Sequence, residues 1–128
     1  MLRAFNPGNV CAPASTYSHG FEVPPTARLV FLSGQIAMRP DGSVPEGIQA
    51  QAEQVWKNIA NCLAEAGMGI GDIVKFTSFL TRTADLAKFS EVRNRFLGAH
   101  RPTSTLLVIQ SLARPEFLVE VEVIAAKV

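Results

Sequence analysis

The chain has 128 residues, of which 48% are hydrophobic and 18% charged, and its 12 basic side chains nearly balance 11 acidic ones. This length fits a single domain over residues 1–128, because two domains would each be too small to enclose a core. The net charge of +1 provides no electrostatic surface for nucleic acid or anionic lipid, so we expect neither nucleic acid nor a membrane as a partner.

The cysteines and histidines indicate whether a metal or another cofactor is expected, and the first ten residues indicate the cellular compartment. The two cysteines form no C-x-x-C pair and the two histidines lie far apart without a ligand pattern, so we expect no disulfide framework, no metal and no cofactor. Residues 1–10 lack a basic segment followed by an apolar run, and no stretch of the chain is apolar over the length of a membrane span. These features favour a soluble, cytoplasmic protein.

Two strands are expected first, over residues 15–23 and 28–36, and they could pair as a hairpin around residues 23–26, Val-Pro-Pro-Thr. Gly34 in the second strand permits a β-bulge or the close approach of another group. Residues 39–43 then contain the Pro, Asp and Gly that turns require.

The middle of the chain alternates between helix and strand. Residues 48–66 are predicted to form a helix, because apolar positions recur at helical spacing and Gly67 can end it. Residues 72–81 change to β-branched and aromatic types, which favour a strand. A second helix is predicted over residues 85–97, followed by Gly98.

Two further strands are predicted over residues 104–112 and 117–126, separated by the turn-like residues 113–116. The order is therefore β-β-α-β-α-β-β, which indicates an α+β fold with two helices packed on one face of a mixed sheet. Strand residues on the uncovered side, such as alternate members of 105–109, are too apolar to face water. We therefore expect this face to pack against further copies of the chain.

Glu120 and Glu122 are the first candidates for chemistry, because strand alternation places both carboxylates on one face. On this pattern alone, solvated acids on an exposed sheet face are the favoured interpretation. The functional alternative is that one carboxylate enters a pocket and acts as a general base.

Three further segments could contact a small ligand. Tyr17 is the only tyrosine, although a packing role is more common for a tyrosine near a strand start. Residues 33–35, Ser-Gly-Gln, could present backbone N–H groups to a ligand or form an ordinary bulge. Residues 101–105 combine a guanidinium with hydroxyl groups, which suits a small anion or a water molecule.

Taken together, these residues resemble the reactive-intermediate deaminase (Rid) superfamily, also called the YjgF family, over nearly the whole chain. The motifs that carry the resemblance are Tyr17-Ser18-His19-Gly20, residues 29–36 (LVFLSGQI), 50–55 (AQAEQV), 65–67 (EAG), 72–77 (DIVKFT), Arg101-Pro102 and residues 119–125 (VEVEVIA). The resemblance implies a chorismate-mutase-like fold and a homotrimer with three small-molecule clefts between subunits.

The resemblance also implies residue roles. In deaminating relatives, an arginine two positions after the proline holds the substrate carboxylate, and a glutamate on the last strand helps direct water onto the C=N carbon. Glu120, Tyr17 and Gly34 match the family's glutamate, tyrosine and backbone contact. The arginine position does not match, because Ser104 stands there, and Leu106 stands where relatives often carry cysteine or serine.

The loss of that arginine matters energetically, because a charged bidentate clamp is much stronger than one hydroxyl, which contributes about 1 kcal/mol. Arg93, Arg101 and Arg114 are candidates for a cation supplied from elsewhere, and a solvated position is the favoured interpretation for each. The expected site has Glu120 as its catalytic residue, with a substrate-binding set of Tyr17, Ser33, Gly34, Gln35, Arg93, Arg101, Ser104, Thr105 and Leu106.

The leading hypothesis is a Rid-type homotrimer that lacks standard 2-imino acid deaminase activity and binds or turns over another small molecule in its cleft. One alternative is a genuine imine or enamine deaminase, a hydrolase that uses another arginine. A second alternative is a non-catalytic metabolite-binding or regulatory trimer. The RNA-cleaving activity attached to some relatives is disfavoured by the nearly neutral charge.

Overall fold

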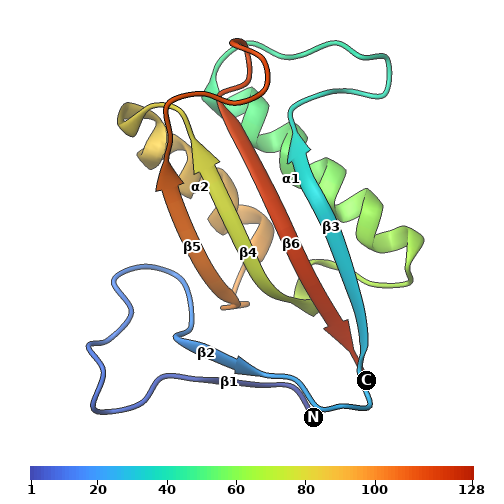
Figure 1. The fold of residues 1–128 in the computed structure, drawn as a ribbon, viewed down its shortest axis with the longest axis vertical. Helices are drawn as coiled ribbons and strands as arrows, with labels where there is room; N and C mark the ends of the chain where they lie inside the picture. Colours follow the sequence, from blue (N-terminus) through green and yellow to red (C-terminus); the bar gives the residue numbers. More distant parts are fainter.

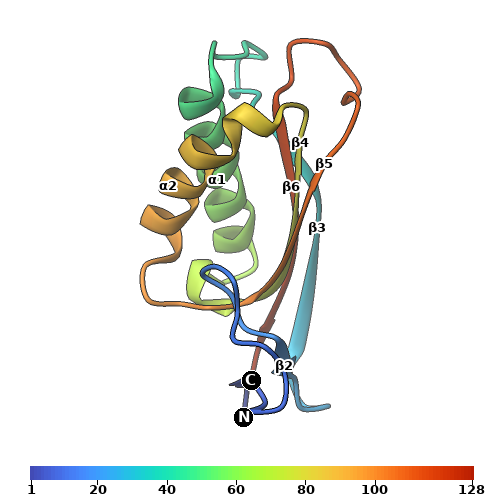
Figure 2. The ribbon, with the colours of Figure 1, turned by 90° about the vertical axis from the view of Figure 1, so that its left-hand side faces the viewer.

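The computed structural model describes residues 1–128 and places two helices on one face of a four-stranded sheet, with a separate two-stranded ribbon beside it (Figures 1 and 2). The sheet contains β3 (Arg28–Ile36), β4 (Ile73–Leu80), β5 (Thr103–Val108) and β6 (Val119–Lys127). The helices are α1 (Ile48–Glu65) and α2 (Leu86–Leu97), and the ribbon consists of β1 (Arg3–Phe5) and β2 (Gly20–Glu22). Short 3₁₀ turns precede β4 (η1, Ile70–Asp72) and α2 (η2, Thr83–Asp85).

The strands follow the order β3-β6-β4-β5 across the sheet. β6 is antiparallel to both of its neighbours, whereas β4 and β5 are parallel and are joined through α2. A parallel pair requires a crossover of this kind, and here it brings α2 onto the same face as α1. The predicted α+β arrangement, with two helices on one face of a mixed sheet, is confirmed.

The core lies between the helices and the sheet, and Trp56 of α1 is at its centre. The Trp56 ring packs edge-on against Phe76 of β4, with 5.4 Å between centroids, and stacks on Phe96 of α2 at 6.2 Å. Both helices are followed by the expected glycine with positive φ, 71° at Gly67 and 58° at Gly98. None of the helices combines the length and the apolar composition of a membrane-spanning segment.

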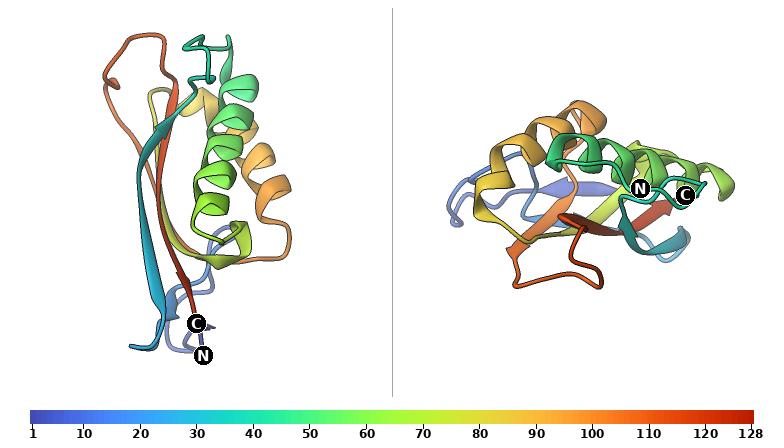
Figure 3. Two further views of the ribbon diagram at one scale, coloured as in Figure 1. Left: turned by 90° about the vertical axis from the view of Figure 1, so that its right-hand side faces the viewer. Right: turned by 90° about the horizontal axis from the view of Figure 1, so that it is seen from above.

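The helices cover only one face of the sheet, as the edge-on views show (Figures 2 and 3). The open face carries large apolar side chains in contact with solvent: Phe31 is 68% exposed, Leu29 51% and Leu107 42%. An apolar uncovered face was expected from residues 105–109. Its burial against further copies of the chain stays a prediction.

The predicted pairing of residues 15–23 with residues 28–36 is wrong. The first segment forms a strand only in β2, which pairs with β1, and β3 pairs with β6. A Cβ at Gly20 would collide with the Phe5 ring, so glycine at this position lets β1 and β2 lie close together. Residues 24–25 are both proline and have no N–H to donate, which keeps β2 from continuing into a hairpin with β3.

The strand predicted over residues 104–112 is shorter, because β5 ends at Val108. Its partner β4 ends at Leu80, which is in register with Val108. The N–H of Ile109 still donates to the carbonyl of Leu80 at 2.8 Å, and no ladder partner lies beyond it. The length of β5 is therefore set by the length of β4.

Candidate functional site

Glu120 lies near the start of β6, in register with Phe79 of β4. Its side chain is half-buried and, by strand alternation, lies on the face that the helices leave open. The register between β3 and β6 shifts between Leu32 and Gln35, which confirms a bulge at Gly34. A Cβ at Gly34 would collide with the Glu120 carboxylate, so any other residue at this position would force the acid to move from its place against β3.

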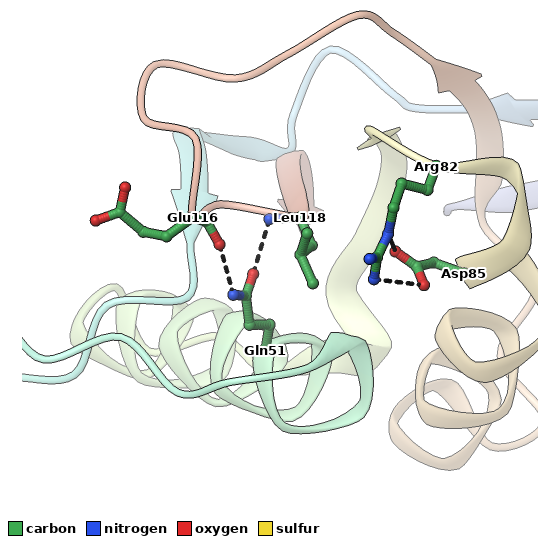
Figure 4. A network of polar contacts seen from close by, with 5 residues as sticks. All are labelled: Gln51, Arg82, Asp85, Glu116 and Leu118. Atoms are coloured by element: carbon green, nitrogen blue, oxygen red, sulfur yellow. Dashed lines mark hydrogen bonds and ion pairs between the residues drawn. The ribbon is translucent and has the colours of Figure 1, made fainter.

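Gln51 of α1 holds the segment that enters β6, and it is only 2% exposed (Figure 4). Its Nε2 donates to the carbonyls of Pro45 (3.1 Å) and Glu116 (2.8 Å), and its Oε1 accepts a hydrogen bond from the N–H of Leu118 (2.8 Å). These three hydrogen bonds fix the chain two residues before Glu120. This role was missed in the sequence, where the available signal is a glutamine among the apolar positions of a predicted helix.

Glu122 shares the open face with Glu120, as strand alternation predicts, but it is exposed. It lines a pocket of about 160 Å³ together with Lys75 and Thr77 of β4 and apolar side chains of β3 and β6. Of the two acids, Glu120 is therefore the one with restricted solvent access and a closely apposed backbone.

Tyr17 lies beside the start of β5, because its neighbour Ser18 is tied there. The Ser18 N–H donates to the carbonyl of Pro102 (3.2 Å), and the Ser18 hydroxyl donates to the carbonyl of Arg101 (2.5 Å). The Tyr17 hydroxyl accepts a hydrogen bond from the N–H of Ala14 at 3.3 Å. The loop before β2 is thereby held against the end of the sheet where β5 begins.

The first residues of β5 point to different faces of the sheet. Ser104 is in register with the core residue Phe76 of β4, and residues in register on parallel strands share a face. Ser104 therefore points toward the helices, and Thr105 points toward the open face that carries Glu120. Leu106 packs against the core. Of these three predicted contacts, only Thr105 shares a face with the catalytic candidate.

Arg93 of α2 is 6% exposed, so the expectation of a solvated side chain is wrong for this residue. Its guanidinium donates to the hydroxyls of Ser15 (3.3 Å) and Thr16 (3.0 Å) and to the side-chain oxygen of Asn94 (3.2 Å). It forms no ion pair with any carboxylate. Burial lowers the pKa of Arg93 from its ordinary value, and the nearby charge of Arg101 lowers it further, although a guanidinium stays protonated at neutral pH.

Arg101 and Arg114 are exposed, as expected, and they differ in their partners. Arg114 forms an ion pair with Glu116 at 2.5 Å, and this hydrogen bond raises the pKa of the arginine. Arg101 donates only to backbone carbonyls, those of Gly98 (2.7 Å) and His100 (3.0 Å). Of the three arginine candidates, Arg114 is therefore already neutralised by a carboxylate.

Most of the predicted site residues fall into two half-sites, one where β3 ends and β6 begins and the other around the start of β5 (Figure 1). The acidic half-site consists of Ser33, Gly34, Gln35 and Glu120, and the cationic half-site consists of Tyr17, Arg93, Arg101 and Ser104. Glu120 of β6 is in register with Phe79 of β4, and Ser104 of β5 is in register with Phe76, three residues earlier, which is roughly 10 Å along the strand. Because β4 lies between β6 and β5, two strand spacings add roughly another 10 Å across the sheet. One chain alone does not bring the two half-sites into one pocket.

Comparison with known sequences identifies relatives over most of the chain. A family model described as Endoribonuclease L-PSP matches residues 8–127. Protein HMF1 of Saccharomyces cerevisiae is 35% identical over 117 residues, which cover 91% of this chain and 88% of the yeast protein. TdcF of Escherichia coli, provisionally named a reactive intermediate deaminase, is 34% identical over 77% of this chain and 79% of its own length.

Solved structures show the same fold. The Rid-family protein YyfB from Yersinia pestis matches with a TM-score of 0.86 at 27% identity and covers 98% of both chains. Escherichia coli TdcF with bound serine matches with a TM-score of 0.75 at 31% identity, over 96% of this chain and 94% of that chain. These matches confirm the chorismate-mutase-like fold expected from the sequence. The sequence motifs, the family match and the shared fold together establish that this chain belongs to the Rid/YjgF/L-PSP family.

Proposed function

We propose that this chain forms a homotrimer whose clefts between subunits bind and hydrolyse a small metabolite with a carbon–nitrogen double bond, other than the standard 2-imino acids. The observation that carries the proposal is the half-buried Glu120 carboxylate lying against Gly34 on the open face of the sheet. Ser104, in place of the guanidinium that the family pattern has there, is the reason for placing the substrate outside the standard 2-imino acids.

Two features support assembly from several copies. The acidic and cationic half-sites lie too far apart in one chain to contact one small molecule, and Phe31 and Leu107 expose apolar surface on the open face. Packing copies of the chain through this face buries that surface and can bring half-sites of different subunits together. Light scattering is expected to give about three times the chain mass of 13.8 kDa, and a stable monomer at micromolar concentration would count against the proposal.

The chemistry assigned to Glu120 is general-base hydrolysis. The carboxylate takes a proton from water as the water oxygen attacks the C=N carbon, and the nitrogen gains a proton to give a carbinolamine. The C–N bond of this intermediate then breaks, so that one imine and one water yield one carbonyl compound and one ammonia. Gly34 contributes by letting the carboxylate lie close to β3.

Glu120→Gln tests this role, with Glu122→Gln as the matched control on the same strand and face. Imines generated by an amine oxidase from a panel of primary amines, ω-amino acids included, serve as substrates, and ammonia release is measured. We expect Glu120→Gln to lower kcat by about 100-fold or more, because a positioned base contributes on this scale, and Glu122→Gln to leave kcat within about twofold. Full activity of Glu120→Gln would remove Glu120 from the mechanism. If the wild type accelerates no imine breakdown, a metabolite-binding trimer replaces the hydrolase.

RNA is not a partner in this proposal, although the family description mentions endoribonuclease. The net charge of +1 gives little support for the phosphate contacts that dominate RNA affinity. Retention of RNA on a filter that weakens steeply with added salt would contradict this part of the proposal.

A further inference from the structure

Arg93 is a buried positive charge without a counter-ion. It is 6% exposed, and its hydrogen-bond partners are two hydroxyls, those of Ser15 and Thr16, and one amide oxygen. Buried charges in proteins are normally paired. The other buried charged residue, Asp85, follows this rule through contacts of 2.8 and 3.0 Å with Arg82 (Figure 4). The Phe89 ring, whose centroid is 5.9 Å from the guanidinium carbon of Arg93, gives a cation–π contact but no opposite charge, so the missing counter-ion requires an explanation.

A second cation adds to the positive charge at this place. Arg101 lies close enough to lower the pKa of Arg93, and its own guanidinium donates to the carbonyls of Gly98 and His100. These contacts place Arg101 at the carboxyl end of α2, where the partial negative charge of a helix favours a cation. The helix end thus accounts for Arg101, but it leaves Arg93 without an opposite charge.

The contacts of Arg93 leave donor groups for a ligand. Its Nε donates to Asn94 and its Nη2 donates to Ser15 and Thr16, whereas its Nη1 makes no hydrogen bond within the chain. The Thr16 hydroxyl donates in turn to Asn94 at 2.8 Å, and Tyr17 follows directly in the chain. A carboxylate can replace these hydroxyls on Nη2, because hydrogen bonds between two charged groups are stronger than those to a neutral acceptor.

We propose that Arg93, assisted by Arg101, binds the carboxylate of the small-molecule ligand, in place of the guanidinium that is absent at Ser104. The inference rests on the proposed function and adds the chemical class of the ligand, a small carboxylic acid whose carboxylate is held from α2 and not from position 104, where the family pattern holds standard 2-imino acids. The planar edge formed by Nη1 and Nη2 matches the two oxygens of a carboxylate. The hydroxyls of Ser15 and Thr16 occupy Nη2 until the ligand displaces them.

The first test compares propionate with propionamide, which has nearly the same shape and no charge. Binding is followed by NMR titration, with the Nε–H signals of the arginine side chains as a direct report. We expect propionate to bind and to shift the Arg93 signal, and propionamide to bind at least about tenfold more weakly. Inorganic phosphate at equal ionic strength is the third probe. Tighter binding of phosphate than of propionate would overturn the assignment to a carboxylate.

Variants then locate the binding group. Arg93→Gln is expected to lower propionate affinity at least about tenfold, and Arg93→Lys, which keeps the charge but not the planar edge, by less. Arg95→Gln is the matched control, because Arg95 lies on the same helix, is exposed and pairs with Glu53 at 3.1 Å. Thermal unfolding confirms that each variant is folded. Unchanged affinity in folded Arg93→Gln, or in Arg93→Lys if the glutamine variant does not fold, would refute the inference.

Thr16→Val separates ligand binding from a structural role of Arg93. This variant removes a hydroxyl that competes for Nη2 without altering any charge, so we expect propionate affinity to rise. A loss as large as that of Arg93→Gln would mean that Arg93 acts only by holding the segment around Tyr17, and the inference would fail.

The failure of this inference can be told apart from the failure of the proposed function. Imine turnover that depends on Glu120, without propionate binding, would reject this inference alone. Propionate binding through Arg93, with full turnover in Glu120→Gln, would reject only the proposed base.

Discussion

Gln51 and Arg93 are two buried polar side chains that each tie a distant segment to a helix. They differ because the hydrogen-bonding groups of Gln51 all have partners, whereas the charge of Arg93 has no counter-ion. Gln51 is neutral, and its amide makes three hydrogen bonds to backbone groups before β6 (Figure 4). Arg93 carries a charge that neutral oxygens and the Phe89 ring contact, and no carboxylate pairs with it. A satisfied neutral network stabilises a fold, whereas a buried charge without a counter-ion costs stability and suits a site where a ligand supplies the opposite charge.

The largest effect on stability is expected at Gln51. Gln51→Leu keeps the side-chain volume but leaves the N–H of Leu118 and the carbonyls of Pro45 and Glu116 without partners, so we expect a loss of about 3 kcal/mol in the free energy of unfolding. Urea unfolding measures this loss. Gln49→Leu, an exposed position on the same helix, is the control and should change stability by less than about 0.5 kcal/mol. Equal effects of the two variants would remove the structural role assigned to Gln51.

Arg93→Met is expected to change the free energy of unfolding by less than about 1 kcal/mol, since removing a buried unpaired charge offsets the hydrogen bonds that are lost. The same urea titration, run on Arg93→Met and wild type, measures the difference. A destabilisation as large as that of Gln51→Leu would show that Arg93 serves the fold, and the contrast between the two side chains would disappear.

The smallest effect concerns the exposed pair of Arg114 and Glu116, in which a guanidinium does have its carboxylate. The hydrogen bond from Arg114 lowers the pKa of Glu116 below its ordinary value of 4.5. The pair therefore adds stability at pH values above 4.5, and this contribution is lost as the pH falls through the lowered pKa. We expect the small difference in Tm between wild type and Glu116→Gln at neutral pH to shrink in acid. A difference that grows on acidification would contradict the assigned pair.

Local signals placed most of the regular structure correctly. The strand predicted over residues 28–36 is β3, and the predicted helices and the strands that became β4 and β6 end within two residues of the observed bounds. Helical periodicity, β-branched composition and glycine stops act over a few residues, so they can be read without the fold. The bulge at Gly34 was likewise expected from its glycine, but its contact with Glu120 required the register of β6.

The sequence by itself therefore determined the helices, three of the sheet strands and the family motifs. Only the tertiary structure decided that β2 pairs with β1, that β5 ends with its partner strand, and that Arg93 is buried. Helical periodicity places Arg93, four residues after Phe89, at the edge of the apolar stripe, and its solvation was expected from its residue type. Residues 15 and 16, which lie 78 and 77 positions away in sequence, contact it. Exposure depends on which distant segment packs over a side chain, and periodicity along one helix does not contain that information.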